Sequence, residues 1–182
     1  GNRTKRGELN PSEFIVSAKQ IIKGEDNLIH CGADDLYSLK QLYSRYCRIY
    51  YSLSAISRRT IIEDELKDEI LTILFPLRAK IETSIFQGLF KIKDQSELLK
   101  IACSKSFFGN SQKQGVSIRF PLLTCAPTKF CAGRCYAHDG RDRELHIVFR
   151  AILNYFVAKA YEDGTKNIKK NIMQGLQKSI DS

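Results

Sequence analysis

Three of the six cysteines in this sequence lie within eleven residues, at Cys125, Cys131 and Cys135. Their spacing is C-x5-C-x3-C, and Pro127 and Gly133 lie between them, where they allow the chain to bend. Thiolates this close in sequence can converge on one soft metal centre. We therefore predict that the three cysteines bind one centre together, either zinc or an iron–sulfur cluster.

The identity of a fourth ligand stays open. Three thiolates leave a tetrahedral zinc site one ligand short, but they can hold three corners of a cubane iron–sulfur cluster. Cys103 and His138 are the nearest candidates for the fourth position, and an exogenous ligand is a further alternative. Two other interpretations also remain: the cysteines are small buried apolar side chains, or two of them form a disulfide in an oxidising compartment.

A second group of residues that could do chemistry follows the cysteines directly. His138, Asp142 and His146 are spaced four residues apart, so they would share one face of a helix that began as early as residue 138. Two imidazoles and a carboxylate could bind a metal ion, or could act as acid and base in a nuclease. The simpler interpretation is a helix start with Asp139 or Asp142 as its N-cap.

The balance of charge favours a polyanionic partner. Lysine and arginine together number 29 and aspartate and glutamate 20, which gives a net charge of +9. Nucleic acid is the first candidate for the partner of such a basic chain. The cations that we assign to this contact are Arg45, Arg48, Arg58, Arg59, Lys169 and Lys170.

The helix expected at about residues 35–57 is rich in tyrosine. Its rings could stack on bases beside cations that neutralise phosphates, or they could be buried in the core with their hydroxyls at its edge. The helical spacing of the apolar residues favours the core. Cys47 lies among the apolar positions of the same helix, and we expect it to be a plain core residue. The five tyrosines are Tyr37, Tyr43, Tyr46, Tyr50 and Tyr51.

The elements that position these residues are predicted to be mainly helical over residues 1–104, with four or five helices and short connections. Ser12, Thr60 and Ser96 are the expected N-caps. Gly24 is expected to end the first helix, and Pro76 to break a helix or to start the next one.

The pattern changes over residues 105–182. Val116, Ile118 and Phe120 alternate as in a strand, beside Gly109, Asn110 and Gly115, which we interpret as turn residues. Two helices are expected after the cysteines, over about residues 142–162 and 165–179. The second is expected to have Met173 on its buried side and Lys166, Lys169, Lys170 and Lys178 on its outer side.

The sequence thus predicts a mainly α fold with a small β or loop element. It comprises a helical domain over 1–104 and a second part over 105–182 that packs with the first as one unit, five to seven helices in all, plus a cysteine-rich metal or cluster loop. No apolar run is long enough to cross a bilayer, so we expect no membrane contact. The first residues hold no apolar segment like that of a signal peptide, and we expect a cytoplasmic protein. No dinucleotide-binding, P-loop, zincin or serine-hydrolase motif occurs.

Residues 109–137, GNSQKQGVSIRFPLLTCAPTKFCAGRCYA, resemble the signature of a phage family described as gene-88-like. In that pattern GNSK-x-G opens a short strand, and a cysteine-rich loop closes on C-Y-A. The resemblance covers roughly 30 of the 182 residues and implies an origin in a phage or another mobile genetic element, without a particular reaction. The matching positions are Gly109, Asn110, Ser111, Lys113, Gly115, Val116, Ser117, Cys125, Cys131, Cys135, Tyr136 and Ala137.

The same loop has a distant resemblance to the cysteine loop of phage radical-SAM-like proteins. The usual triad of those proteins is C-x3-C-x2-C at the start of a βα barrel, whereas only 47 residues follow Cys135 here. Either the chain is a fragment, or the loop binds a cluster in a different fold.

We therefore expect a nucleic-acid-binding protein of a phage or mobile genetic element, with a cysteine-ligated zinc or iron–sulfur site. One alternative is an enzyme, either a metal-dependent nuclease or an iron–sulfur enzyme of radical-SAM type. A second alternative is an adaptor that binds a protein partner and modulates a phage or host complex.

Overall fold

Three helices form the first part of the fold: α1 (Pro11–Lys23), α2 (Leu36–Ser57) and α3 (Asp64–Leu89). The structure is a computed structural model that describes residues 10–24, 35–59, 61–104, 108–111, 115–126, 128, 145–164 and 168–181. In each of the three helices the apolar residues recur at helical spacing, and burial of that side holds the helix in place.

The ends of α1 show how local side chains set its bounds. The N-cap is Asn10 and not Ser12, because Asn10 Oδ1 accepts a hydrogen bond from the Ser12 backbone N–H at 3.1 Å. Gly24 ends the helix, as predicted, with a left-handed φ of 74°.

The third helix differs from the prediction in two ways. It begins at Asp64, after Glu63 as N-cap, and so starts later than a cap at Thr60 would place it. The prediction that Pro76 breaks a helix is also wrong, because α3 continues through it. A proline inside a helix costs about 3 kcal/mol through a missing hydrogen bond and a crowded carbonyl. Pro76 faces solvent while Leu77 beside it is fully buried, and burial of both halves of the helix offsets that cost.

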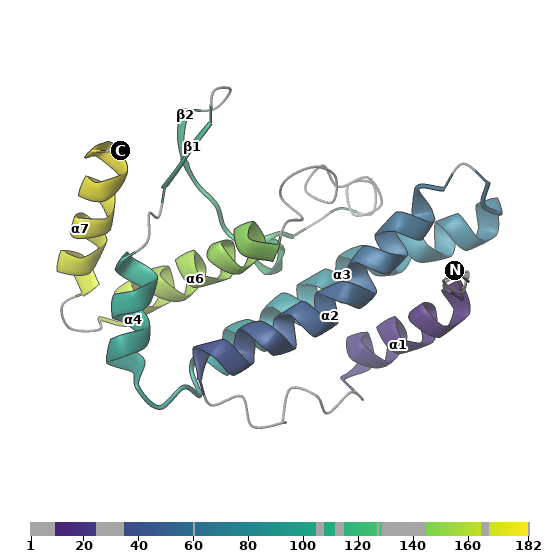
Figure 1. Cartoon of the computed structure of the whole chain (residues 1–182), viewed down its shortest axis with the longest axis horizontal. Helices are drawn as coiled ribbons and strands as arrows, with labels where there is room; N and C mark the ends of the chain where they lie inside the picture. The colour runs from purple at the N-terminus through teal and green to yellow at the C-terminus, as the bar shows by residue number, and fades with distance from the viewer. Residues whose placement is uncertain are drawn as a thin grey trace, which may run out of the picture.

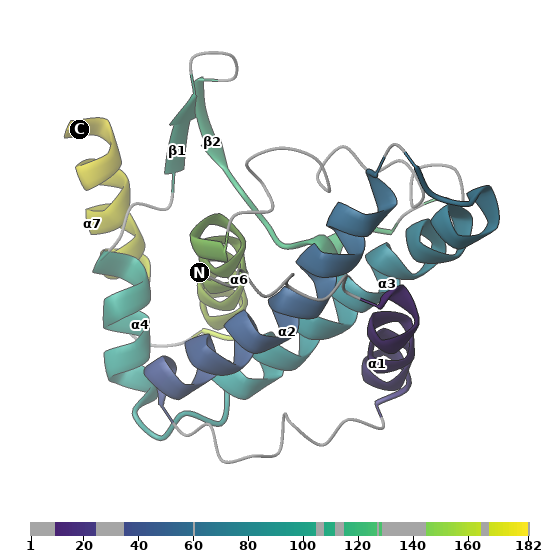
Figure 2. The same cartoon turned by 45° about the vertical axis from the view of Figure 1, so that its right-hand side comes forward.

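The helices α2 and α3 lie side by side and antiparallel along the length of the molecule (Figure 1). On one side α1 packs against both of them, and on the other side they are covered by α6 (Leu145–Glu162) (Figure 2). The largest fully buried side chains come from α2, α3 and α6. They are Leu39, Tyr43, Tyr46, Tyr50, Leu53, Ile56, Ile70, Leu77, Ile85, Leu89, Ile152 and Phe156.

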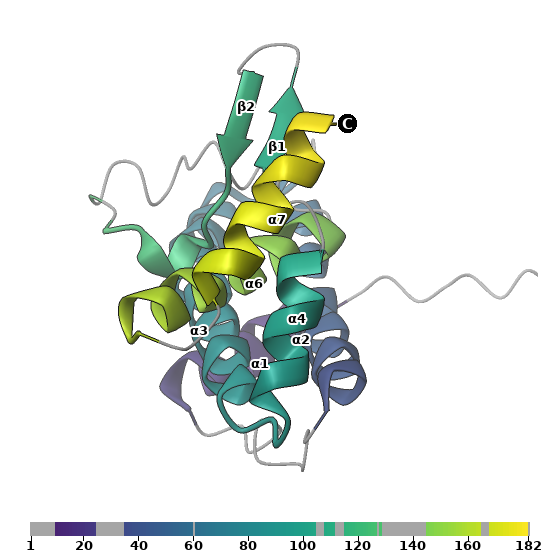
Figure 3. The same ribbon diagram turned by 90° about the vertical axis from the view of Figure 1, so that its left-hand side faces the viewer.

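A second group of elements lies at one end of this bundle. The helices α4 (Gln95–Ser104) and α7 (Ile168–Asp181) pack together there, and β1 of a small hairpin contacts α7 (Figure 3). The cap of α4 is Asp94 and not Ser96, because Asp94 Oδ1 accepts from the Glu97 N–H at 2.9 Å.

The hairpin consists of β1 (Phe108–Ser111) and β2 (Gly115–Ile118), which pair antiparallel. A strand over Val116, Ile118 and Phe120 was predicted. Its first two positions lie in β2, but the strand ends at Ile118, before Phe120, and its partner β1 was not predicted. Gly109, Asn110 and Gly115 were interpreted as turn residues. Instead, Gly109 and Asn110 lie in β1, opposite Ser117 and Val116, and Gly115 is the first residue of β2. Pairing with β2 overrides the turn preference of glycine and asparagine.

The last helix confirms the predicted outward lysines but corrects one position. Lys169, Lys170 and Lys178 are exposed, and Lys166 lies outside the described residues. Met173, predicted to be buried, is 56% exposed. None of the helices in the described ranges has the length and apolarity that crossing a bilayer requires. Those ranges are mainly helical with one small β element, as predicted. Most of the predicted cysteine-rich loop, including Cys131 and Cys135, lies outside them.

Candidate functional site

The exposed side of α2 carries a set of cations. Arg45 and Arg48 are three residues apart, so they lie on neighbouring positions of the helix surface, and both are exposed. Arg58 and Arg59 follow directly after the last residue of α2 and are exposed as well. The structure therefore places four of the six predicted nucleic-acid contacts along one helix and its C-terminal end. We call Arg45, Arg48, Arg58 and Arg59 the α2 basic stripe.

The basic stripe is not neutralised by its own helix, because no aspartate or glutamate occurs between Leu36 and Ser57. Among the described residues, Arg45, Arg48 and Arg59 make no ion pair. Arg58 donates from Nη2 to the Ser54 hydroxyl at 2.7 Å, which holds its guanidinium against the last turn of α2. A row of cations without carboxylates between them attracts polyanions.

The acidic residues of this region are on the neighbouring helix. The first turns of α3 expose Asp64, Glu65, Asp68 and Glu69, near the positive end of the helix dipole. Glu69 pairs with Lys19 of α1 at 2.9 Å across an exposed surface. These carboxylates form a solvated face, and in the described structure they are not arranged as a metal site.

The other two predicted contacts, Lys169 and Lys170, lie in the first turn of α7. This helix packs against α4 at one end of the bundle, whereas the C-terminal end of α2 lies toward the other end (Figure 1). The structure therefore does not bring these lysines together with the α2 basic stripe.

Of the predicted metal ligands, only Cys125 is described with its side chain. It follows the short 3-10 helix η2 (Leu122–Thr124), it is exposed, and its N–H donates to the Leu122 carbonyl oxygen at 2.9 Å. Cys103 belongs to α4, but its side chain lies outside the described residues, as do Cys131, Cys135 and His138 in full. The convergence of the three thiolates therefore stays a prediction.

The side chains of the predicted acid–base group also lie outside the described residues. His138 and Asp142 are outside the described ranges. His146 is the second residue of α6 (Leu145–Glu162), but its side chain lies outside the described residues. The shared helical face of the three residues stays a prediction as well.

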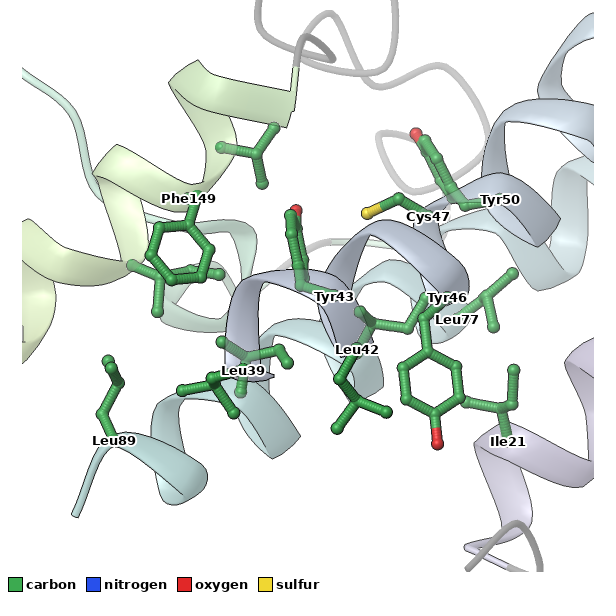
Figure 4. Close-up of a cluster of buried hydrophobic side chains, with 14 of the residues drawn as sticks. Ile21, Leu39, Leu42, Tyr43, Tyr46, Cys47, Tyr50, Leu77, Leu89 and Phe149 are labelled. Carbon is green, nitrogen blue, oxygen red and sulfur yellow. The ribbon is translucent and has the colours of Figure 1, made fainter. Parts of the chain in front are cut away.

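The tyrosines of α2 are largely core residues, as the helical spacing predicted. Tyr43, Tyr46 and Tyr50 are at most 2% exposed. Figure 4 shows Tyr46 pointing toward Ile21 of α1, while Tyr43 and Tyr50 point to a different side of α2. Only Tyr37, at the start of the helix, is strongly exposed, at 72%.

A buried ion pair that the sequence interpretation did not single out lies in the middle of α3. Arg78 donates from Nε to Glu82 Oε1 at 3.1 Å, and Glu82 is fully buried. The other carboxylate oxygen of Glu82 accepts from the backbone N–H of Leu123 in η2 at 2.9 Å. The guanidinium of Arg78 also lies over the ring of Tyr50, 5.6 Å from its centre.

Burial sets the direction of the pKa shift of two groups in this region, the Glu82 carboxyl and the Cys47 thiol. It raises the pKa of Glu82, and the charge of Arg78 and the N–H of Leu123 counteract only part of that rise. Burial also raises the pKa of the nearby Cys47 thiol to about 12, so this thiol stays protonated at neutral pH. A protonated thiol is neither a good nucleophile nor a metal ligand, which agrees with the prediction that Cys47 is a plain core residue.

The sequence holds a signal for this pair. Arg78 and Glu82 are four residues apart, and each directly follows a residue of the apolar series Leu77, Ile81 and Ile85. Opposite charges at this spacing beside a buried stripe indicate an ion pair at the edge of a core. Both side chains are buried, and Glu82 positions η2, the segment that leads to Cys125.

Comparison of the chain with known protein families, with curated proteins and with solved structures found no match.

Proposed function

We propose that this protein binds nucleic acid through the α2 basic stripe, as a cytoplasmic protein of a phage or another mobile genetic element. The observation that carries the proposal is the exposure of Arg45 and Arg48 on a helix without a carboxylate, with the exposed Arg59 two residues beyond its end. The net charge of +9 agrees with it, because such a charge raises the local concentration of polyanions. The resemblance of residues 109–137 to a phage signature supports an origin in a phage or another mobile genetic element.

The rigidity of α2 supports the same proposal. The opposite side of the helix is anchored in the core by Tyr43, Tyr46 and Leu53, so the exposed arginines project from a fixed backbone. Guanidinium groups form bidentate hydrogen bonds with phosphate oxygens. A fixed row of them can follow a phosphate backbone without ordering a flexible segment first.

The test is the salt dependence of binding to labelled DNA and RNA, both single-stranded and double-stranded, measured by fluorescence anisotropy. Replacement of Arg45 and Arg48 by glutamine is expected to weaken binding. The magnitude of the log–log salt slope should fall by about 0.9 for each phosphate that is no longer neutralised on duplex DNA, and by about 0.7 on a single strand. The fold should be retained, because both side chains are exposed.

Lys19→Gln is the matched control for the single variant Arg48→Gln, since each removes one positive charge and Lys19 belongs to the exposed pair with Glu69 and not to the stripe. Its salt slope is expected to stay close to that of the wild type. An equal change of slope in the control and in Arg48→Gln would show a general effect of net charge, and would reject the α2 basic stripe. Absence of binding to any nucleic acid at low salt would reject the proposed function.

We further propose that Cys125, Cys131 and Cys135 hold a zinc ion or an iron–sulfur cluster, with Cys103 or His138 as the fourth ligand. The exposure of Cys125 supports this part of the proposal, because a ligand at the surface remains accessible to a metal ion. The anchoring of η2 by Glu82 supports it too, because it places the first cysteine at a defined position beside the bundle. Such a centre would add its binding energy to the stability of the loop.

A further inference from the structure

Four aromatic rings form a continuous row across three separate segments of the fold, and we call Phe90, Phe86, Tyr155 and Phe120 the aromatic row. Phe86 is in α3, Phe90 follows the end of α3, Tyr155 is in α6, and Phe120 follows β2. Neighbouring ring centroids lie 5.1 Å apart for Phe86–Phe90, 4.7 Å for Phe86–Tyr155 and 6.3 Å for Phe120–Tyr155. These separations are typical of interacting aromatic pairs.

Both ends of the aromatic row face solvent. Phe90 is 47% exposed and Phe120 is 48% exposed, while Phe86 and Tyr155 between them are half-buried. Phenylalanine is among the residues most often found inside a protein, so two half-exposed phenylalanines on one packed row are informative. They offer a surface on which a further flat ring can stack.

The aromatic row is held in place by buried residues. Phe90 packs edge-on against the ring of Phe156, which is 1% exposed, with centroids 5.0 Å apart. Asn154, also buried in α6, donates from Nδ2 to the carbonyl oxygen of Arg119 at 3.0 Å. This bond fixes the residue before Phe120 against α6. Rings held in this way lose little conformational freedom when a ligand binds.

Cations border the aromatic row. Lys159 Nζ lies 5.8 Å from the centre of the Tyr155 ring, and Glu162 pairs with this ammonium group at 2.8 Å. Lys91 and Lys93 follow the ring at the end of α3, and both are exposed. Aromatic rings flanked by ammonium groups match a ligand that combines flat bases with phosphates.

We propose that the aromatic row binds single-stranded nucleic acid, with unpaired bases stacked on Phe90 and Phe120 and phosphates near Lys91 and Lys93. This inference rests on the proposed function and adds to it a class of nucleic acid and a second contact surface. Bases in a duplex already stack on one another, whereas those of a single strand expose their faces. The aromatic row therefore favours a single strand over a duplex.

The first experiment uses the absence of tryptophan from the chain. Phe120→Trp introduces one fluorescent ring into the aromatic row. A single-stranded oligonucleotide is expected to quench its emission over the same concentration range in which anisotropy shows saturable binding of the labelled strand. Constant emission while the strand saturates the protein would overturn the proposal for this surface.

The second experiment removes the two exposed rings. Phe90→Ala/Phe120→Ala is expected to weaken single-strand binding about a hundredfold, since stacking on each of the two rings can be worth about tenfold. The salt slope should be unchanged because no charge is removed, and duplex affinity should be unchanged as well. Tyr161→Ala is the matched control, because it removes a ring of α6 that is 53% exposed but lies outside the aromatic row. Circular dichroism checks that each variant keeps its helical content.

The outcomes distinguish this inference from the proposed function. If variants of the α2 basic stripe weaken binding and the aromatic variants do not, the inference is wrong and the proposed function stands. If wild-type protein binds no nucleic acid at low salt, both are wrong. If the aromatic variants change the oligomeric state in size-exclusion chromatography and leave strand affinity intact, the aromatic row is an interface between copies of this chain, and the inference is wrong.

Discussion

Glu82 and Leu123 are 41 residues apart in the chain and are joined by a hydrogen bond of 2.9 Å, which the Leu123 N–H donates to Glu82 Oε2. Glu82 belongs to the middle of α3, and Leu123 belongs to the 3-10 helix that directly precedes Cys125. Because Glu82 is fully buried and paired with Arg78, it is a fixed anchor. The start of the cysteine-rich segment is therefore positioned by a carboxylate of the helical bundle.

This anchor predicts strong coupling between Arg78 and Glu82. Glu82→Ala is expected to lower the free energy of unfolding by about 3–5 kcal/mol, because a buried guanidinium loses its counter-ion. Arg78→Leu/Glu82→Leu should cost less than the sum of the two single leucine variants, since no buried charge remains. Urea denaturation measures all of these values. Additive costs of the two leucine substitutions would contradict the coupling.

The raised pKa of Cys47 predicts a stability change at alkaline pH. A thiol whose pKa is raised from 9.0 to about 12 on folding contributes stability that is complete below pH 9.0 and is lost as the pH rises toward about 12. In that window the free energy of unfolding should fall by up to about 1.4 kcal/mol per pH unit from this group.

Cys47→Ala provides the comparison, because it removes the thiol and leaves the other titrating groups in place. Its free energy of unfolding should fall less steeply with pH than that of the wild type over the same window. At neutral pH an alkylating reagent should modify the exposed Cys125 well before the buried Cys47 in native protein. Equal pH slopes for wild type and variant would contradict the raised pKa.

Close packing of α2 against α3 predicts the effect of Gly88→Ala. A Cβ at Gly88 would lie 2.8 Å from Leu39 Cδ1, and Leu39 is buried. Alanine improves helix propensity by about 1 kcal/mol, but overpacking costs typically about 1–3 kcal/mol, so we expect a net loss of stability. Thermal unfolding measures the change. In the double variant with Leu39→Ala the cost of the glycine substitution should disappear, and its persistence would contradict the steric explanation.

The proposed metal centre predicts that bound metal is lost when a loop cysteine is replaced and is kept when another cysteine is replaced. Cys125→Ser is expected to remove bound zinc, or the visible absorption of an iron–sulfur cluster, from protein purified without oxygen. The buried Cys47 is the matched control, and Cys47→Ser should keep the metal at the wild-type ratio. Elemental analysis and the visible spectrum report both results. Equal metal content in Cys125→Ser and wild type would reject a role for Cys125 as a ligand.

The helical character of the chain could be predicted because the signals are local. The apolar periodicity of α2 follows from its own residues, and so does the left-handed end of α1 at Gly24. The same reasoning predicted that Tyr43 and Cys47 are buried and that Lys169 is exposed, and the structure confirms all three. The exact N-caps were harder, because Asn10 and Ser12 are both good capping residues and lie two positions apart.

The composition and spacing of the sequence by themselves determined that this protein is basic, mainly helical and supplied with closely spaced thiols. Tertiary structure alone decided that α3 passes through Pro76, that Glu82 holds Leu123 and that Phe120 joins Tyr155 in the aromatic row. The physical reason is the distance along the chain over which each kind of interaction acts. Periodicity and capping act over a few residues, whereas these three features depend on contacts between segments far apart in the chain, where burial outweighs local preference.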